Sequence, residues 1–153
     1  MSKWKWIKHL ISLGVVIGLA SCMSAPVEPY YQRSQLVSFD FNSNALFSEY
    51  VQHMHQQLGE QRVFFDPQQK EKELDRVAPF ELRPSPNCPT QLVQGILLIH
   101  GLLDTSYAMK DLAPFFHERC FLVRSVLLPG HGTRPADLID VRYRQWKEAV
   151  DYG

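Results

Sequence analysis

The residue types that perform nucleophilic hydrolysis, a serine, a histidine and an aspartate, occur beside two turns in the second half of this chain. Asp104 and Ser106 follow an apolar run that ends at His100, and His131 lies in a Pro-Gly-His-Gly turn. A serine that is activated by a histidine, itself oriented by an acid, can attack a carbonyl carbon. Ser106 is nevertheless better explained as a helix cap and His131 as a turn residue. Residue types alone therefore favour a buried strand and a turn without chemistry.

Two apolar runs position these turns, and we predict that they form neighbouring parallel strands. Residues 93–99 end in four consecutive apolar residues, which is typical of a strand buried on both faces, and residues 121–128 form a second such run. Between them, Thr105 or the serine after it would cap a helix over residues 107–117, which Pro114 would kink or split. This order favours a βαβ crossover in a sheet covered by helices.

Weaker signals predict three further elements. Asn42 or Asn44 would cap a helix that runs to about Leu58. Residues 76–82 are a weak strand candidate, which Pro79 confines to a sheet edge or a bulge. Residues 140–151 are predicted to be helical, with Val141, Trp146, Ala149 and Val150 on the inward face.

The two strand–turn pairs together resemble a known family. The segments GILLIHGLLDTSYAMKDLAPFF and FLVRSVLLPGHGTRPADL, with Trp146 in the next helix, resemble the N-terminal part of an α/β-hydrolase. The nearest subgroup is the carboxylesterases, monoacylglycerol lipases and lysophospholipase-like hydrolases. The resemblance covers roughly residues 76–153. It implies an α/β fold, namely the N-terminal part of an α/β-hydrolase sheet with helices on both faces, truncated before the nucleophile elbow.

The resemblance also implies roles for the turn after the first strand. In this family the turn supplies one backbone N–H of the oxyanion hole, and the matching donor is Leu102. Gly101 would allow a tight bend and a close approach of substrate to the backbone. His100 would brace the loop as a buried structural residue. The side chains of Leu102 and Leu103 would line an acyl pocket that excludes water.

The nucleophile that the family requires is not in this sequence. In members of the family the nucleophilic serine lies in a Gly-x-Ser-x-Gly motif on a strand-to-helix elbow. No two of the eight glycines of this chain flank a serine in this way. A triad of Ser106, His131 and Asp104 is rejected because neither Ser106 nor His131 lies on an elbow. We therefore expect this chain to be the inactive N-terminal part of a serine hydrolase that cleaves carboxylic esters of lipids or other acyl compounds. Alternatives are a non-catalytic lipoprotein that acts as a binding module, and a peptidase or epoxide hydrolase of the same fold.

The N-terminus has the pattern of a secretion signal. Three lysines precede a short apolar run, which is typical of a signal peptide and too short to span a bilayer. The letters LASC that end at Cys22 resemble the lipobox of bacterial lipoproteins, which implies that Cys22 is acylated and anchors the chain in the bacterial cell envelope. By the same resemblance, an aspartate in place of Met23 would imply retention in the inner membrane, so we expect the periplasmic face of the outer membrane. The alternative is an ordinary signal peptide in which Cys22 is incidental.

These patterns divide the chain into four segments: a signal peptide (1–21), a tether (22–41), a helical N-terminal extension (42–75) and a partial α/β-hydrolase domain (76–153). Cys88 and Cys120 each precede a predicted strand, so parallel neighbours would bring both to one edge of the sheet. Either a disulfide between them or two separate thiols fits this placement. The oligomeric state stays open.

Composition excludes other classes of partner. The 16 basic residues balance the 16 acidic ones, so no net charge attracts nucleic acid. His53 and His55 point in different directions on a helix, and we expect no metal site there. No cofactor is expected.

Overall fold

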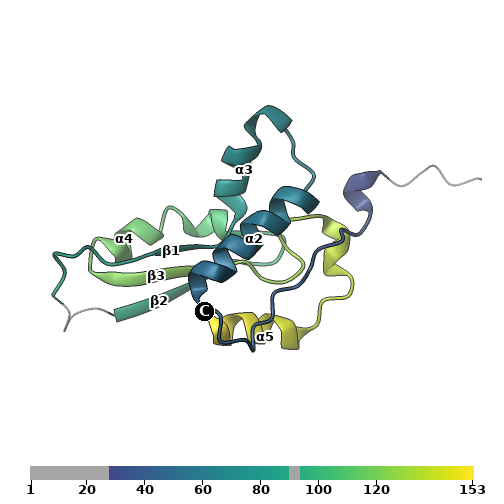
Figure 1. Ribbon diagram of the computed structural model, residues 1–153. Coiled ribbons are helices and arrows are strands. Elements are labelled where there is room, and N and C mark those ends of the chain that lie inside the picture. Colours follow the sequence, from purple (N-terminus) through teal and green to yellow (C-terminus); the bar gives the residue numbers. More distant parts are fainter. Residues whose placement is uncertain (1–27, 90–93) are drawn as a thin grey trace, which may run out of the picture.

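The computed structural model describes residues 28–89 and 94–153, which form a small mixed sheet with helices on both faces (Figure 1). In chain order the helices and strands are α2 (Phe47–Gln61), α3 (Lys70–Val77), β1 (Phe80–Leu82), β2 (Gln94–Ile99), α4 (Ala113–His117), β3 (Phe121–Val126) and α5 (Tyr143–Tyr152). Short 3-10 turns are η1 (Pro29–Tyr31), η2 (Pro67–Gln69), η4 (Ser106–Met109) and η5 (Pro135–Leu138).

The sheet has the strand order β1-β3-β2. β2 and β3 are parallel, with Ile96 opposite Val123, and β1 is antiparallel to β3, with Phe80 opposite Ser125. The prediction of two neighbouring parallel strands is therefore confirmed. The weak strand is shorter than expected, because residues 76 and 77 still belong to α3, where Val77 is buried.

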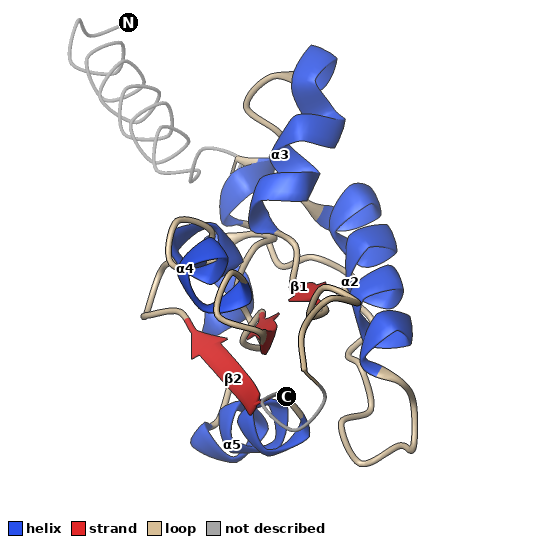
Figure 2. Cartoon of the chain, turned by 90° about the vertical axis from the view of Figure 1, so that its left-hand side faces the viewer, coloured by secondary structure: helices blue, strands red, loops and turns tan. Residues whose placement is uncertain are grey.

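Two apolar clusters cover the two faces of the sheet. On one face, Ala113 of α4 packs with Leu98 and Val123. On the other face, α2 and α5 contribute Leu58 and Ala149 to a cluster that includes Val126. Figures 1 and 2 show the same division, with α4 on one side of the strands and α2 and α5 on the other. The described part is therefore three layers thick, and α2 packs in the same core as the sheet.

β2 is less buried than the sequence predicted. Leu98 is buried, but Ile96 and Leu97 are only half-buried and Ile99 is 43% exposed. The reason is that β2 is an outer strand of the described sheet, with β3 on one side only. A row of backbone groups and apolar side chains therefore stands open along its free edge.

The helix between β2 and β3 is split as Pro114 predicted. Thr105 caps the first piece, η4, because its hydroxyl accepts from the N–H of Tyr107. The second piece, α4, has Pro114 in its first turn. Since proline lacks an N–H, this turn is where the residue costs least.

The start of α2 differs from the prediction. The helix begins at Phe47, where Glu49 accepts from the backbone N–H of Leu46 at 2.7 Å. Neither Asn42 nor Asn44 is the cap. Asn42 instead belongs to a turn in which its N–H donates to Asp40.

Residues 33–41, here called the strap, lie against the domain, although the sequence placed them in a tether. The backbone N–H groups of Ser34 and Val37 donate to the side chains of Asp137 and Gln57. Further along the strap, two aromatic residues pack in a cluster of rings around α2 and α5, which consists of Phe39, Phe41, Phe47, Tyr50 and Tyr152. The strap is therefore part of the fold.

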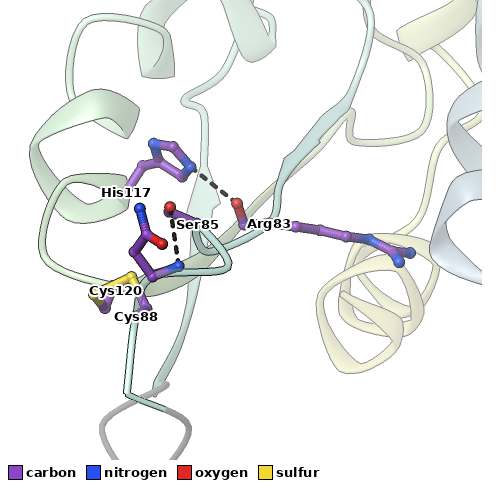
Figure 3. The surroundings of a disulfide bond; sticks show 6 residues. Arg83, Ser85, Cys88, His117 and Cys120 are labelled. Atoms are coloured by element: carbon purple, nitrogen blue, oxygen red, sulfur yellow. Dashed lines mark hydrogen bonds between the residues drawn. A yellow bond between two sulfur atoms is a disulfide. The ribbon is translucent and has the colours of Figure 1, made fainter.

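A disulfide joins Cys88 to Cys120, with their Cα atoms 5.6 Å apart (Figure 3). It ties the segment before β2 to the residue before β3, where the parallel pair begins. Beside it, His117 donates from Nε2 to the carbonyl of Arg83. Of the two open alternatives for these cysteines, the structure has the bridge.

Candidate functional site

The turn that follows β2 is held by a buried histidine. His100 Nε2 accepts from the N–H of Leu128 at 3.0 Å, and Nδ1 donates to the carbonyl of Gly101 at 2.9 Å. Burial lowers the pKa of His100, and the nearby His131 acts in the same direction. A neutral ring is what these bonds require, because Nε2 must keep a free lone pair. His100 thus links the end of β2 to the segment that follows β3.

A second buried histidine makes the reciprocal link. His131, in the turn after β3, accepts at Nε2 from the N–H of Leu103 at 3.3 Å. Its Nδ1 lies 3.2 Å from the carbonyl oxygens of both Leu128 and Pro129, so it is the protonated nitrogen. The two histidine rings are 4.8 Å apart. Each turn therefore supplies the histidine that fixes the backbone of the other.

Trp146 secures the second turn from α5. Its indole N–H donates to the carbonyl of Pro129 at 2.9 Å, and its ring lies 5.8 Å from that of His131. Within the turn, Gly130 and Gly132 have positive φ angles of 83° and 82°. A Cβ at Gly130 would lie 2.6 Å from the side chain of Val141. The two glycines of the Pro-Gly-His-Gly turn are therefore required by both backbone angle and space.

The left-handed residue in the turn after β2 is a leucine. Leu103 has a φ of 62°, a region that bulky side chains rarely adopt, whereas Gly101 has no positive φ. The bend predicted at Gly101 therefore does not use a left-handed glycine, and the left-handed residue of this turn is Leu103. A Cβ at Gly101 would meet nothing within 4 Å, so this backbone is open to approach from outside. The left-handed residue is held by the bond from its own N–H to His131.

The two leucines of the turn are both exposed. Leu102 is 68% exposed and Leu103 is 77% exposed, so they do not form a closed apolar pocket in the part of the chain that the structure describes. Leu103 does line a cavity of about 490 Å³, together with Tyr30, His131 and Arg134. The backbone N–H of Leu102 has no hydrogen-bond acceptor within residues 28–89 and 94–153.

The residues of the rejected triad are far from a catalytic arrangement. Ser106 is completely buried and donates to the carbonyl of Val126 at 3.3 Å. Asp104 is exposed and accepts from the N–H of Thr105. His131 uses both ring nitrogens on the backbone of the turns. Ser106 is therefore a structural residue behind the site.

Lipid attachment, metal binding and membrane crossing are three further possibilities that the sequence raises. Cys22, the expected lipid attachment point, lies outside the described residues. In the described residues, no three His, Cys, Asp or Glu side chains gather where they could hold a metal ion. The same residues contain no helix of the length and apolar character that crossing a bilayer needs.

The sequence reasoning did not single out Tyr50 and Arg62 on the N-terminal side. The Tyr50 hydroxyl accepts from the N–H of Leu127 at 3.0 Å and donates to its carbonyl at 3.1 Å. Arg62 donates to the carbonyl of Gly132. Only the helical spacing of residues 47–58 could have indicated that Tyr50 faces inward, and no motif connects it to the turns.

Fold and site together define a mixed α/β protein in which a parallel strand pair presents two interlocked turns. No family model matches the chain. Over 59 residues the chain is 32% identical to the thermostable monoacylglycerol lipase of Bacillus sp. (strain H-257). The match covers 39% of this chain and 24% of the lipase, so the chain spans about a quarter of that relative. This distant, partial similarity supports a relation to α/β-hydrolases and nothing finer.

Proposed function

We propose that this chain is the N-terminal part of a membrane-anchored serine hydrolase of the α/β-hydrolase type, which cleaves carboxylic esters through an acyl-enzyme. The observation that carries the proposal is the turn after β2. Its Leu102 N–H has no acceptor in the described residues, and both neighbouring segments of backbone are held by buried histidines. An N–H that is held in place and bonded to no other group of the described chain is available to donate to an oxyanion.

The chemistry assigned to this chain is electrostatic. During acyl transfer the carbonyl oxygen of the ester gains negative charge, and a preorganised donor stabilises it more than it stabilises the substrate. Leu102 would supply this donor, and the open space at Gly101 would admit the reacting carbonyl. A nucleophilic serine on a Gly-x-Ser-x-Gly elbow, about 15–30 residues beyond residue 153 in a longer form, would supply the attacking oxygen and the second donor.

The location is part of the same proposal. The LASC sequence ending at Cys22 supports acylation there, and with it an anchor on the periplasmic face of the bacterial outer membrane. The disulfide between Cys88 and Cys120 supports an oxidising compartment. The acyl ester would then reach the site from lipid or from the periplasm.

A second candidate function is a non-catalytic lipoprotein that binds acyl compounds. The absence of Gly-x-Ser-x-Gly from the 153 residues favours it. Labelling with a fluorophosphonate separates the two: a form extended by the following coding sequence should become labelled at the elbow serine if the first proposal holds. The chain of 153 residues should not react, and labelling of Ser106 would contradict the assignment of that residue.

The oxyanion role is tested on the extended form by a matched pair of substitutions. Leu102→Pro removes the N–H and should lower kcat on p-nitrophenyl esters about 10²–10³-fold. Leu102→Ala keeps the N–H, so it should spare the oxyanion donor and alter mainly the preference for acyl chain length. The fold should tolerate this change, since the side chain is exposed. Circular dichroism must show that the proline variant is folded. A folded Leu102→Pro enzyme with full activity would disprove the role of this amide.

A further inference from the structure

The Tyr50 side chain makes two buried hydrogen bonds to one residue far away in the sequence. Its hydroxyl accepts from the N–H of Leu127 and donates to the carbonyl of the same residue, across 77 positions. Tyr50 is completely buried, and burial raises the pKa of its phenol well above the usual value. The phenol therefore stays protonated and can play both roles at once. Helix α2 thereby fixes the peptide groups on both sides of Leu127, directly after β3.

Two other contacts join the C-terminal end of α2 to the turn that follows β3. Arg62 donates from Nη1 to the carbonyl of Gly132, and Arg134 donates from Nε to the carbonyl of Gln61 at 3.1 Å. Space is tight as well, because a Cβ at Gly132 would lie 3.0 Å from the side chain of Leu58. The turn of residues 129–132 is thus held along one side by α2.

The held turn in turn fixes the loop after β2. Leu128 follows Leu127, the residue to which Tyr50 is hydrogen-bonded. The N–H of Leu128 donates to His100, and His131 accepts from the N–H of Leu103. A continuous series of hydrogen bonds therefore runs from α2 through residues 127–131 to the loop of residues 100–103. Leu103 has a left-handed backbone, which persists only where its surroundings hold it.

We infer that Tyr50 is a positioning residue for the loop after β2: α2 sets the backbone of residues 127–131, and the two histidines pass that geometry to Leu102 and Leu103. The catalytic meaning of this inference rests on the proposed function. The mechanical part does not, because it concerns only hydrogen bonds within the chain. On this view the N-terminal segment of the chain is a functional part of the site.

The test compares two tyrosines of one aromatic cluster. Tyr50→Phe removes the hydroxyl that is hydrogen-bonded to the backbone of Leu127. Tyr152→Phe removes a hydroxyl that donates to the carbonyl of Ala45, away from both turns. The full chain is labelled with ¹⁵N, and NMR follows the solvent exchange of the Leu103 amide and the ¹⁵Nε2 shift of His131. Exchange of the Val123 amide, at the centre of β3, serves as the reference for global opening.

Tyr50→Phe should raise the exchange rate of Leu103 relative to Val123 by about tenfold and shift the His131 Nε2 signal, because the bond between them loosens. Tyr152→Phe should change this ratio less than about twofold. A residue that supports only stability would speed both amides together. An unchanged ratio in a folded Tyr50→Phe chain would therefore overturn the inference.

A second pair keeps the inference testable if Tyr50→Phe does not fold. Arg62→Met removes the bond to Gly132, and Arg144→Met changes an exposed arginine of α5 as its control. The same change in the Leu103 ratio is expected for Arg62→Met alone, and its absence counts against the inference. Because no step uses catalysis, loss of this result would leave the Leu102 experiment intact, and failure of the Leu102 experiment would leave this result standing.

Discussion

Removing the disulfide should destabilise the domain by an amount that depends on the length of the loop that the bridge closes. The bridge joins residues 32 positions apart, and the loop between them contains β2, the turn that follows it and α4. In the chain-entropy account, closing a loop of this length lowers the free energy of folding by about 3–4 kcal/mol at 25 °C. For a domain of this size, that corresponds to a fall in Tm of about 12–16 °C.

The choice of replacement separates the cross-link from local strain. Cys120 has a φ of 66°, so a serine there keeps a left-handed backbone that costs about 1–2 kcal/mol. Glycine carries no such cost. Cys88→Ser with Cys120→Ser should lose the full amount of about 3–4 kcal/mol, and Cys88→Ser with Cys120→Gly should lose about 1 kcal/mol less.

Urea unfolding followed by circular dichroism measures these free energies, with oxidised wild type and wild type in reductant as references. The free energy of unfolding of the reduced wild type should be close to that of the double-serine variant. A thiol count on the denatured, unreduced protein checks that the bridge is present. Equal free energies of unfolding, within about 0.5 kcal/mol, for oxidised wild type and the double-serine variant would refute the reasoning.

Three further expectations follow from the turns and the core. Gly130→Ala should lower the free energy of unfolding in urea by about 2–4 kcal/mol, because φ is positive and the new Cβ meets Val141. Gly101→Ala should lower it by less than about 0.5 kcal/mol, and equal effects would contradict the geometry. Because burial lowers the pKa of His100 in the folded state, the unfolded chain binds the proton more tightly, so stability should fall as the pH drops below about 6.5, and His100→Gln should flatten this slope. Ser125→Ala should raise stability by about 1 kcal/mol, since the buried hydroxyl has no hydrogen-bond partner within the described residues; a loss would show that the hydroxyl is satisfied.

The elements that depend on local signals could be predicted from the sequence. The apolar runs before His100 and before Pro129 became the parallel pair β2 and β3, and Pro114 split the intervening helix. These features follow from hydrophobic patterning and from the missing N–H of proline, which act over a few residues. The predicted helix over residues 140–151 likewise appears as α5, three residues late at its start.

The features that depend on distant partners could not be predicted in this way. The strap looked like a tether because prolines and tyrosines without periodicity precede it, yet Ser34 bonds to Asp137, 103 positions away. Tyr50 gave no signal beyond its place in a helix. The left-handed backbone of Leu103 could not be predicted, because the sequence does not reveal that His131 accepts a hydrogen bond from its N–H.

The attachment of the N-terminal segment limits how far the domain can reach. Arg134 donates to the carbonyl of Pro29, so the chain is fixed to the domain from that residue onward. If Cys22 carries a lipid, the seven steps to Pro29 span at most about 25 Å when fully extended. This segment of residues 22–29 is thus shorter than the width of a domain of this size, about 35 Å. It joins the domain beside the cavity that Tyr30, Leu103 and Arg134 line. If Cys22 carries a lipid, the domain would therefore stay within about one domain width of the membrane that holds this lipid.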